Sequence, residues 1–138
     1  MRVDFDSIKP IYLQIAEAIE DDIIVGRLPE GSPAYSQLIL SKELGVNPAT
    51  AAKGINVLVQ DGLLIKERGK SMIVAAGART RIVSGRQRNG LHSLVSNLVR
   101  EAQKIELPKE DVLSMVSEYY SQNSQNGSIG HAGKGAAQ

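Results

Sequence analysis

Few side chains in this sequence have the type and spacing that catalysis or metal binding needs. The neighbouring acids Asp21 and Asp22 lie where helix-surface charge is expected, and Glu110 and Asp111 lie where first-turn charge is expected. The chain has no cysteine, and its two histidines, His92 and His131, are far apart and poorly accompanied by other ligands. We therefore predict that the protein is not an enzyme and has no metal site and no cofactor.

Basic side chains, by contrast, gather in one part of the chain. Residues 62–104 hold nine lysines and arginines against two glutamates, a net charge of +7. Residues 1–31 hold three basic against seven acidic side chains, a net charge of −4. This segregation favours a polyanion as partner of the basic part. The stretch from Arg79 to Arg88 fits a solvated linker and a second phosphate-contacting stretch equally well.

Apolar spacing predicts two helices in the first third of the chain. Apolar residues recur at helical intervals from Pro10 to Val25, and Gly26 is placed to end that helix. A turn-rich connection follows, and then Ser36 can cap a second helix that ends at Gly45. The expected apolar stripe of the second helix consists of Leu38, Ile39, Leu40 and Leu44.

A third helix is predicted to begin directly after the second. Asn47 is a capping residue, Pro48 suits the first helical position, and the helix should end near Asp61 and Gly62. Two short helices joined by a glycine-containing turn of about four residues form a helix-turn-helix. The residues expected to face inward from the third helix are Ala51, Ile55, Leu58 and Val59.

A short hairpin is predicted next. Residues 63–65 and 72–74 have the composition of two strands, and Arg68, Gly69 and Lys70 form a basic turn between them. Three helices followed by a hairpin make a winged helix. We therefore predict a mainly α fold with a small β-hairpin, in which residues 1–77 form a winged helix-turn-helix domain.

The remaining residues are predicted to form a basic linker at 78–90, a helical region at 91–120 and a disordered tail at 121–138. The two helices of residues 91–120 have too few neighbouring segments to bury their apolar faces, so we expect a short dimerisation region and a homodimer. The residues expected in that interface are Leu91, Leu94, Val95, Leu98, Val112, Val116 and Tyr119. No apolar run approaches the roughly 20 residues of a membrane span, and we expect a soluble, cytoplasmic protein.

Four motifs resemble the GntR family of bacterial transcriptional regulators, in its small YtrA-type subfamily. They are PIYLQIAEAI, GRLPEG, LGVNPAT and the DGLL…RGK wing, in that order over about residues 9 to 75. The resemblance implies that the helix beginning at Pro48 enters the major groove of double-stranded DNA and that the wing approaches phosphates or the minor groove. The implied DNA-binding residues are Ser36, Asn47, Pro48, Ala49, Thr50, Ala52, Lys53, Asn56, Lys66, Arg68, Gly69 and Lys70.

The sequence departs from the family pattern at three places. Leu38 replaces an arginine that typically contacts a guanine, so that base contact is not carried over, and Ser71 replaces a wing glycine. Small residues at 51, 52 and 54 are expected to thin the recognition helix. We therefore expect an altered or weaker sequence preference, compensated in part by phosphate contacts from the wing.

The resulting hypothesis is a sequence-specific transcriptional regulator that represses as a homodimer on an inverted-repeat operator. Lys53 suits guanine and Asn56 suits adenine in such a complex. Whether a small-molecule effector exists is left open. The alternative is a winged-helix protein-interaction module with weakened base readout, in which the apolar helices and the end at Tyr119 and Tyr120 bind another protein.

Overall fold

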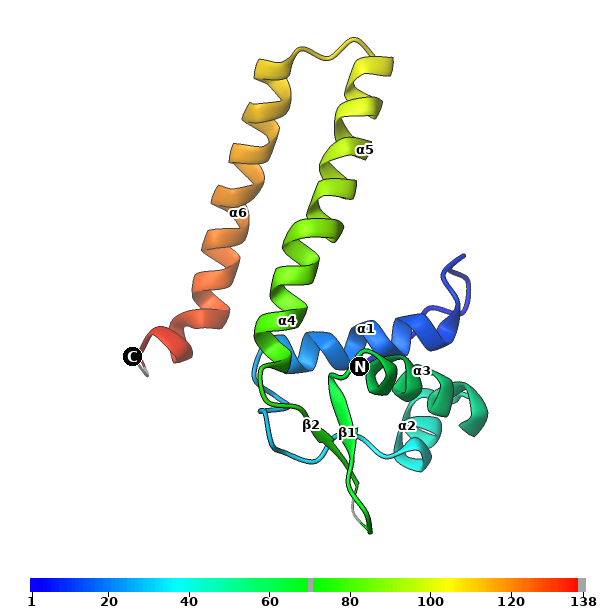
Figure 1. The fold of residues 1–138 in the computed structure, drawn as a ribbon. Helices are drawn as coiled ribbons and strands as arrows, with labels where there is room; N and C mark the ends of the chain where they lie inside the picture. Colours follow the sequence, from blue (N-terminus) through cyan, green and yellow to red (C-terminus); the bar gives the residue numbers. More distant parts are fainter. Residues whose placement is uncertain (70, 137–138) are drawn as a thin grey trace. The chain divides into compact units, whose positions relative to one another are not determined.

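The computed structural model describes the backbone of residues 1–69 and 71–136 and the side chains up to residue 124, apart from Lys70. The chain forms two compact units, Met1–Asn89 and Gly90–Gln138. The first unit holds helices and a two-stranded sheet, and the second holds two helices joined by a short loop (Figure 1). Within the described part of the chain, no helix combines the length and the apolar character needed to cross a membrane.

Helix α1 (Ile11–Ile24) follows the apolar pattern that predicts it. Pro10 precedes it with ψ 143°, a position where the missing proline N–H would have had no helical partner. Ile15, Ile19 and Ile23 follow one another at intervals of one turn and are almost fully buried. Each such side chain stabilises the fold by about 2 kcal/mol, so α1 is a central part of the core.

Helices α2 (Gln37–Leu44) and α3 (Pro48–Gln60) form the predicted helix-turn-helix. Gly45 ends α2 in the left-handed conformation, with φ 66°, which glycine adopts without a Cβ clash. The chain then needs only two further residues before α3 begins. Side chains from α3 enter the core as the sequence predicts: Ala51, Ile55 and Leu58 are buried, and Val59 packs against them.

The apolar stripe predicted for α2 is wrong in part. Leu40 is buried and Leu44 packs against the core, but Leu38 and Ile39 are 59% and 51% exposed. Successive residues of a helix differ by about 100° around its axis, so Leu44 lies close to Leu40 while Leu38 and Ile39 point elsewhere. A helix of two turns presents only one such row to α3. Two large apolar side chains are therefore left on the surface.

The predicted hairpin is present as β1 (Leu64–Lys66) and β2 (Met72–Val74). The strands are antiparallel, with Leu64 opposite Val74 and Lys66 opposite Met72. The loop before α2 adds a further edge to this sheet, because the Ala34 amide donates to the Met72 carbonyl over 2.7 Å. The hairpin completes the winged helix, and its tip projects beyond the rest of the first unit (Figure 1).

The basic linker predicted at residues 78–90 is wrong. Helix α4 (Ala78–Gly85) and a single π-helical turn, η1 (Arg86–Gly90), occupy this stretch. Ala78 and Ile82 are buried, and α4 packs against α1. Two apolar residues one turn apart are enough to dock a short helix, but they are too few to stand out in a sequence crowded with arginine.

The second unit contains α5 (Leu91–Lys104) and α6 (Lys109–Ala136). The sequence predicts disorder from residue 121, whereas the backbone of α6 is helical to Ala136. That prediction rested on the loss of apolar residues, which governs packing. An existing helix, however, gains one backbone hydrogen bond for each residue added, without a new nucleation cost.

Helices α1 and α3 approach each other closely at Gly54. A Cβ placed on Gly54 would lie 2.8 Å from the Ile15 Cγ2 atom and 2.9 Å from the Tyr12 carbonyl oxygen, both in α1. Ala51, one turn earlier on α3, is fully buried. The sequence predicts that residues 51 and 54 thin the recognition helix, and the structure places both in the core, away from its exposed face. Gly54 is small because it faces α1.

We predict that Gly54→Ala destabilises the protein, because the added methyl group meets backbone as well as side chain. Overpacking of this kind costs about 1–3 kcal/mol, offset by up to about 1 kcal/mol from the better helix propensity of alanine. The melting temperature should fall by about 5 °C. Gly85→Ala in α4 is the matched control, since its Cβ would meet nothing within 4 Å, and it should melt at or above the wild-type temperature. An unchanged melting temperature in Gly54→Ala would contradict the close approach.

Candidate nucleic-acid interface

The outward face of α3 carries most of the side chains predicted to read DNA. Ala49, Lys53 and Asn56 are exposed, while Thr50 and Ala52 are half-buried. Lys53 and Asn56 are three residues apart and thus neighbours on one helix surface. This face offers one ammonium group, which donates hydrogen bonds, and one carboxamide, which both donates and accepts them. Both groups can hydrogen-bond to the edges of DNA bases.

Two predicted contact residues, Ser36 and Asn47, cap the helices. The Ser36 Oγ accepts from the Ile39 amide at 3.1 Å, and the Asn47 Oδ1 accepts from the Ala49 amide at 2.8 Å. A serine hydroxyl that accepts in this way still has its own proton to donate. Pro48, exposed, occupies the first position of α3. These residues therefore fix where the two helices begin, and Ser36 keeps a donor for a phosphate.

The wing presents cationic side chains around its turn. Lys66, at the end of β1, and Arg68 are exposed. Gly69 has φ 73°, a left-handed conformation that lets the chain reverse between the strands. Lys70 lies outside the described residues. The hairpin thus offers exposed cationic side chains, Lys66 and Arg68, of the kind that contact phosphates.

Sequence reasoning missed one residue beside this interface, Tyr12. Its ring lies under Lys53, with the Lys53 Nζ 4.2 Å from the ring centroid. Tyr12 and Lys53 also line a hollow of about 390 Å³, together with Phe5, Ile11, Gly45, Val46, Asn47 and Thr50. Tyr12 stands in the PIYLQI motif, but its position inside a long apolar helix pattern gave no sign that it faces α3.

The loop that leads into α2 is held by a buried carboxylate. Asp22 is 7% exposed, and its two oxygens accept from the Tyr35 hydroxyl and, at 2.9 Å, from the Arg27 guanidinium. Burial, together with the hydrogen bond and negative charge of Asp22, raises the pKa of Tyr35 to about 12. This contact ties the end of α1 to the residue before the cap of α2, and so helps to place the helix-turn-helix.

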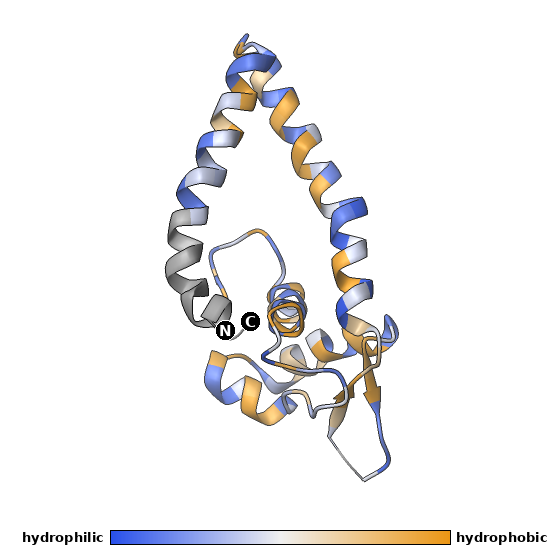
Figure 2. Cartoon of the chain, turned by 90° about the vertical axis from the view of Figure 1, so that its left-hand side faces the viewer, coloured by the Kyte–Doolittle hydropathy of each residue, from blue (hydrophilic) through white to orange (hydrophobic). Residues whose placement is uncertain are grey.

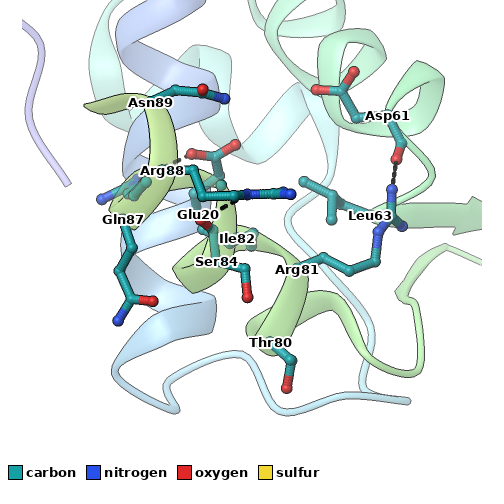
Figure 3. Close-up of a pocket in the computed structure, with 12 residues that line it drawn as sticks. Glu20, Asp61, Leu63, Thr80, Arg81, Ile82, Ser84, Gln87, Arg88 and Asn89 are labelled. Carbon is teal, nitrogen blue, oxygen red and sulfur yellow. Dashed lines mark hydrogen bonds and ion pairs between the residues drawn. The ribbon is translucent and has the colours of Figure 1, made fainter. Parts of the chain in front are cut away.

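Arginines of the predicted linker bind the protein itself. Arg81 donates to the Asp61 carbonyl at 2.6 Å and to the Gly62 carbonyl at 3.2 Å, at the end of α3 (Figure 3). Arg86 forms ion pairs of 3.0 Å with Glu20 and 2.7 Å with Asp21. The hollow of about 750 Å³ beside them is lined by residues of α4 and η1 and by Glu20, Asp61 and Leu63. Much of the basic charge in residues 78–90 is thus engaged in contacts with carboxylates and with carbonyl groups at helix ends.

The predicted dimerisation residues lie on an uncovered apolar surface of the second unit. Figure 2 shows apolar residues recurring along α5. The exposed fractions are 55% for Leu91, 64% for Leu94, 56% for Val95, 40% for Leu98, 38% for Val116 and 62% for Tyr119, and Val112 is half-buried. Leu98, Val112, Val116 and Tyr119 line a hollow of about 350 Å³ with Met115, Tyr120 and Asn123.

Comparison with known proteins gives relatives that are transcription regulators. No protein-family model matches the chain. The uncharacterised HTH-type regulator YhcF of Bacillus subtilis is 26% identical over 115 residues, which are 83% of this chain and 93% of YhcF. The repressor YtrA of the same organism is 27% identical over 62% of this chain and 66% of its own length. The repressor NagR, also from B. subtilis, is 29% identical over 54% of this chain, but the match spans only 31% of NagR.

The solved structures that resemble this chain also include transcription regulators. A GntR-family regulator from Listeria monocytogenes has a TM-score of 0.68 and 26% identity, covering 83% of this chain and 98% of its own. AraR(DBD) in complex with operator ORX1 has a TM-score of 0.50 and 26% identity, covering 54% of this chain and 95% of its own. The resemblance to the GntR family and the winged-helix fold class are confirmed. Fold and relatives are those of a DNA-binding transcriptional regulator, not of an enzyme.

We predict that Tyr35→Phe lowers stability at pH 7 by about 1 kcal/mol, because the buried Asp22 loses one hydrogen bond. The same variant should respond less to alkali. The pKa of Tyr35 is raised from 10.0 to about 12 on folding, so the stability it contributes is present below pH 10 and lost as the pH rises toward 12.

Urea unfolding between pH 9 and 11.5 measures this effect, with Tyr120→Phe as the control at a 74% exposed tyrosine. Wild type and Tyr120→Phe should lose stability in parallel, and Tyr35→Phe should lose less. Equal losses of stability in all three proteins would show that the contact with Asp22 does not raise the pKa of the Tyr35 hydroxyl.

Proposed function

We propose that this protein is a transcriptional repressor that binds an inverted-repeat operator as a homodimer. The observation that carries the proposal is the division of α3 into two faces. Ala51, Ile55 and Leu58 are buried in the core, whereas Lys53 and Asn56 are exposed on the opposite face. A helix divided in this way can lie in the major groove without disturbing the core.

In this proposal the two parts of the interface have different tasks. Asn56 pairs with adenine and Lys53 with guanine, which sets the sequence preference. Lys66 and Arg68 of the wing contact phosphates, which fixes the register of the domain on the duplex and makes binding sensitive to salt. Leu38 offers no hydrogen bond to a base, so the preference rests mainly on α3.

Repression follows from occupancy of a promoter by the dimer. YtrA and NagR are both named repressors, which supports this direction of control. A two-fold dimer places two recognition helices on half-sites separated by about one helical turn, and such a protein excludes polymerase from the sequence it covers. As a DNA-binding protein it would act in the cytoplasm.

The alternative function is a protein-interaction module. One observation favours it: Leu38 and Ile39 are large, apolar and exposed at the start of α2, next to the proposed DNA-facing surface. Light scattering combined with DNA titration separates the two functions. A homodimer whose DNA affinity falls with salt fits only the repressor.

We predict that Lys53→Ala weakens binding to a selected operator more than binding to random DNA. Loss of a base contact costs about 1–3 kcal/mol, or about 5- to 150-fold in affinity, whereas loss of one phosphate contact weakens both DNAs alike. Electrophoretic shift assays measure both affinities at two salt concentrations. Lys109→Ala, in the second unit, is the control and should bind both DNAs as wild type does.

Two results would count against the proposal. No retardation of operator DNA at low salt would remove the DNA-binding function itself. Equal losses on operator and random DNA would reduce Lys53 to a phosphate contact and leave base readout to other residues.

We also predict that Leu94→Lys weakens the dimer. The side chain is 64% exposed in the single chain, and a charge there would be buried without a partner if a second copy covers this face. Sedimentation equilibrium should show a dissociation constant raised at least about tenfold, equivalent to 1.4 kcal/mol. Ser93→Lys adds the same charge on the opposite side of α5 and should leave the dimer intact. Equal behaviour of the two variants would place the interface elsewhere.

A further inference from the structure

A lysine and a tyrosine from different helices meet at the proposed interface. The Lys53 Nζ lies 4.2 Å from the centroid of the Tyr12 ring, within the range of a cation–π contact. Lys53 comes from the outward face of α3 and is exposed, while Tyr12 comes from α1 and is half-buried. The ammonium group therefore lies over one face of the Tyr12 ring, and the ring is the less exposed partner of the contact.

The ring has little freedom to move away. Its own backbone carbonyl is one of the two atoms that approach Gly54 most closely, 2.9 Å from where a Cβ would lie, so the backbone at Tyr12 is pressed against α3. A tyrosine side chain has only two rotatable angles beyond this fixed backbone. Ala51, two residues before Lys53 on the same helix, is fully buried. The backbone that carries the ring is thus held close to α3 by the contact at Gly54.

Lysine by itself is poorly suited to discriminate between bases. Its ammonium group is a compact charge on a flexible four-carbon stem, and ordering that stem costs up to about 2 kcal/mol. A lysine that is free to move can satisfy its charge on many phosphates, which are nearer to the protein surface than base edges are. A lysine whose position is already restricted loses less entropy at one particular acceptor.

We propose that Tyr12 is a positioning residue for base readout: its ring holds the Lys53 ammonium group over the outer face of α3 before DNA arrives. The ring occupies one side of the ammonium group and leaves its N–H donors free for the O6 and N7 acceptors of a guanine. Tyr12 thereby increases the preference for operator over random DNA without contacting a base. The inference rests on the proposed DNA-binding function and adds a residue that sets its specificity.

A double-mutant cycle tests the proposal. The proteins are wild type, Tyr12→Phe, Tyr12→Leu, Lys53→Ala and the Tyr12→Leu/Lys53→Ala double variant. Each is titrated against DNA that wild type selects from a random pool and against a random duplex of equal length. Phenylalanine keeps the π face and removes only the hydroxyl, so it is the matched control for leucine.

The expected result is that Tyr12→Leu weakens binding to selected DNA only where Lys53 is present. Tyr12→Leu should weaken binding to selected DNA by about 3- to 30-fold, the range for a cation–π contact, and binding to random DNA by less than about twofold. Tyr12→Phe should bind selected DNA within about twofold of wild type. In the Lys53→Ala background, Tyr12→Leu should cause no further loss, because the group that the ring positions is already absent.

Two results would overturn the inference. If Tyr12→Leu causes the same loss with and without Lys53, Tyr12 acts through packing or through its own DNA contact. If Tyr12→Leu binds selected DNA more tightly, the ring holds the lysine back from DNA. Thermal melting of all variants shows whether a loss comes from unfolding, and the wild-type resonances of Lys53 test the contact if the leucine variant proves unstable.

A measurement without DNA separates this inference from the proposed function. The ring should shift the proton resonances of the Lys53 Cε methylene upfield in the free protein, and Tyr12→Leu should abolish that shift while Tyr12→Phe keeps it. Absence of the shift in wild type would refute the contact even if DNA binding is intact. The expected upfield shift in a protein that binds no DNA would refute the proposed function but still support the contact between Lys53 and Tyr12.

Discussion

The rest of the first unit depends on the close contact between α1 and α3 at Gly54. Helices whose side chains all carry a Cβ pack with their axes 8–10 Å apart, and a glycine at the crossing lets the backbones come nearer. Here the Tyr12 carbonyl and the Ile15 side chain fill the space that a Cβ would need. This contact fixes the rotation of α3 about its own axis, and with it the identity of the residues on the outer face.

Charged side chains serve two purposes in this protein. Some bind other groups within the first unit, and others are exposed to solvent. Two acidic side chains of α1, Glu20 and Asp21, are neutralised within the first unit by their ion pairs with Arg86 of η1. Arg81 instead binds carbonyl groups at the end of α3, where a cation offsets the negative end of the helix dipole. Among the cations that stay exposed in the described part of the chain, Lys53 lies on α3 and Lys66 and Arg68 lie on the wing.

The two units differ in how they satisfy their apolar side chains. In the first, a single cluster built on Ile15, Ile19 and Leu58 excludes water completely. In the second, Ala102 is the one apolar side chain that is buried among those described, and most of the large apolar residues stay exposed, with Leu107 and Val112 half-buried. Two helices alone cannot enclose a core, because each covers only one side of the other. The second unit therefore leaves an apolar surface exposed, and this is the surface assigned to the proposed dimer.

Sequence alone determined the elements whose signals are local. Caps, helix-ending glycines and apolar periods place α1, α2, α3 and the hairpin within a residue or two, because each depends on neighbours along the chain. Only the tertiary structure decided that Gly54 packs against α1, where the arginines of α4 bind, and that Tyr12 meets Lys53. These outcomes depend on how helices pack across long separations in sequence, and no periodicity within one segment records which partner it will meet.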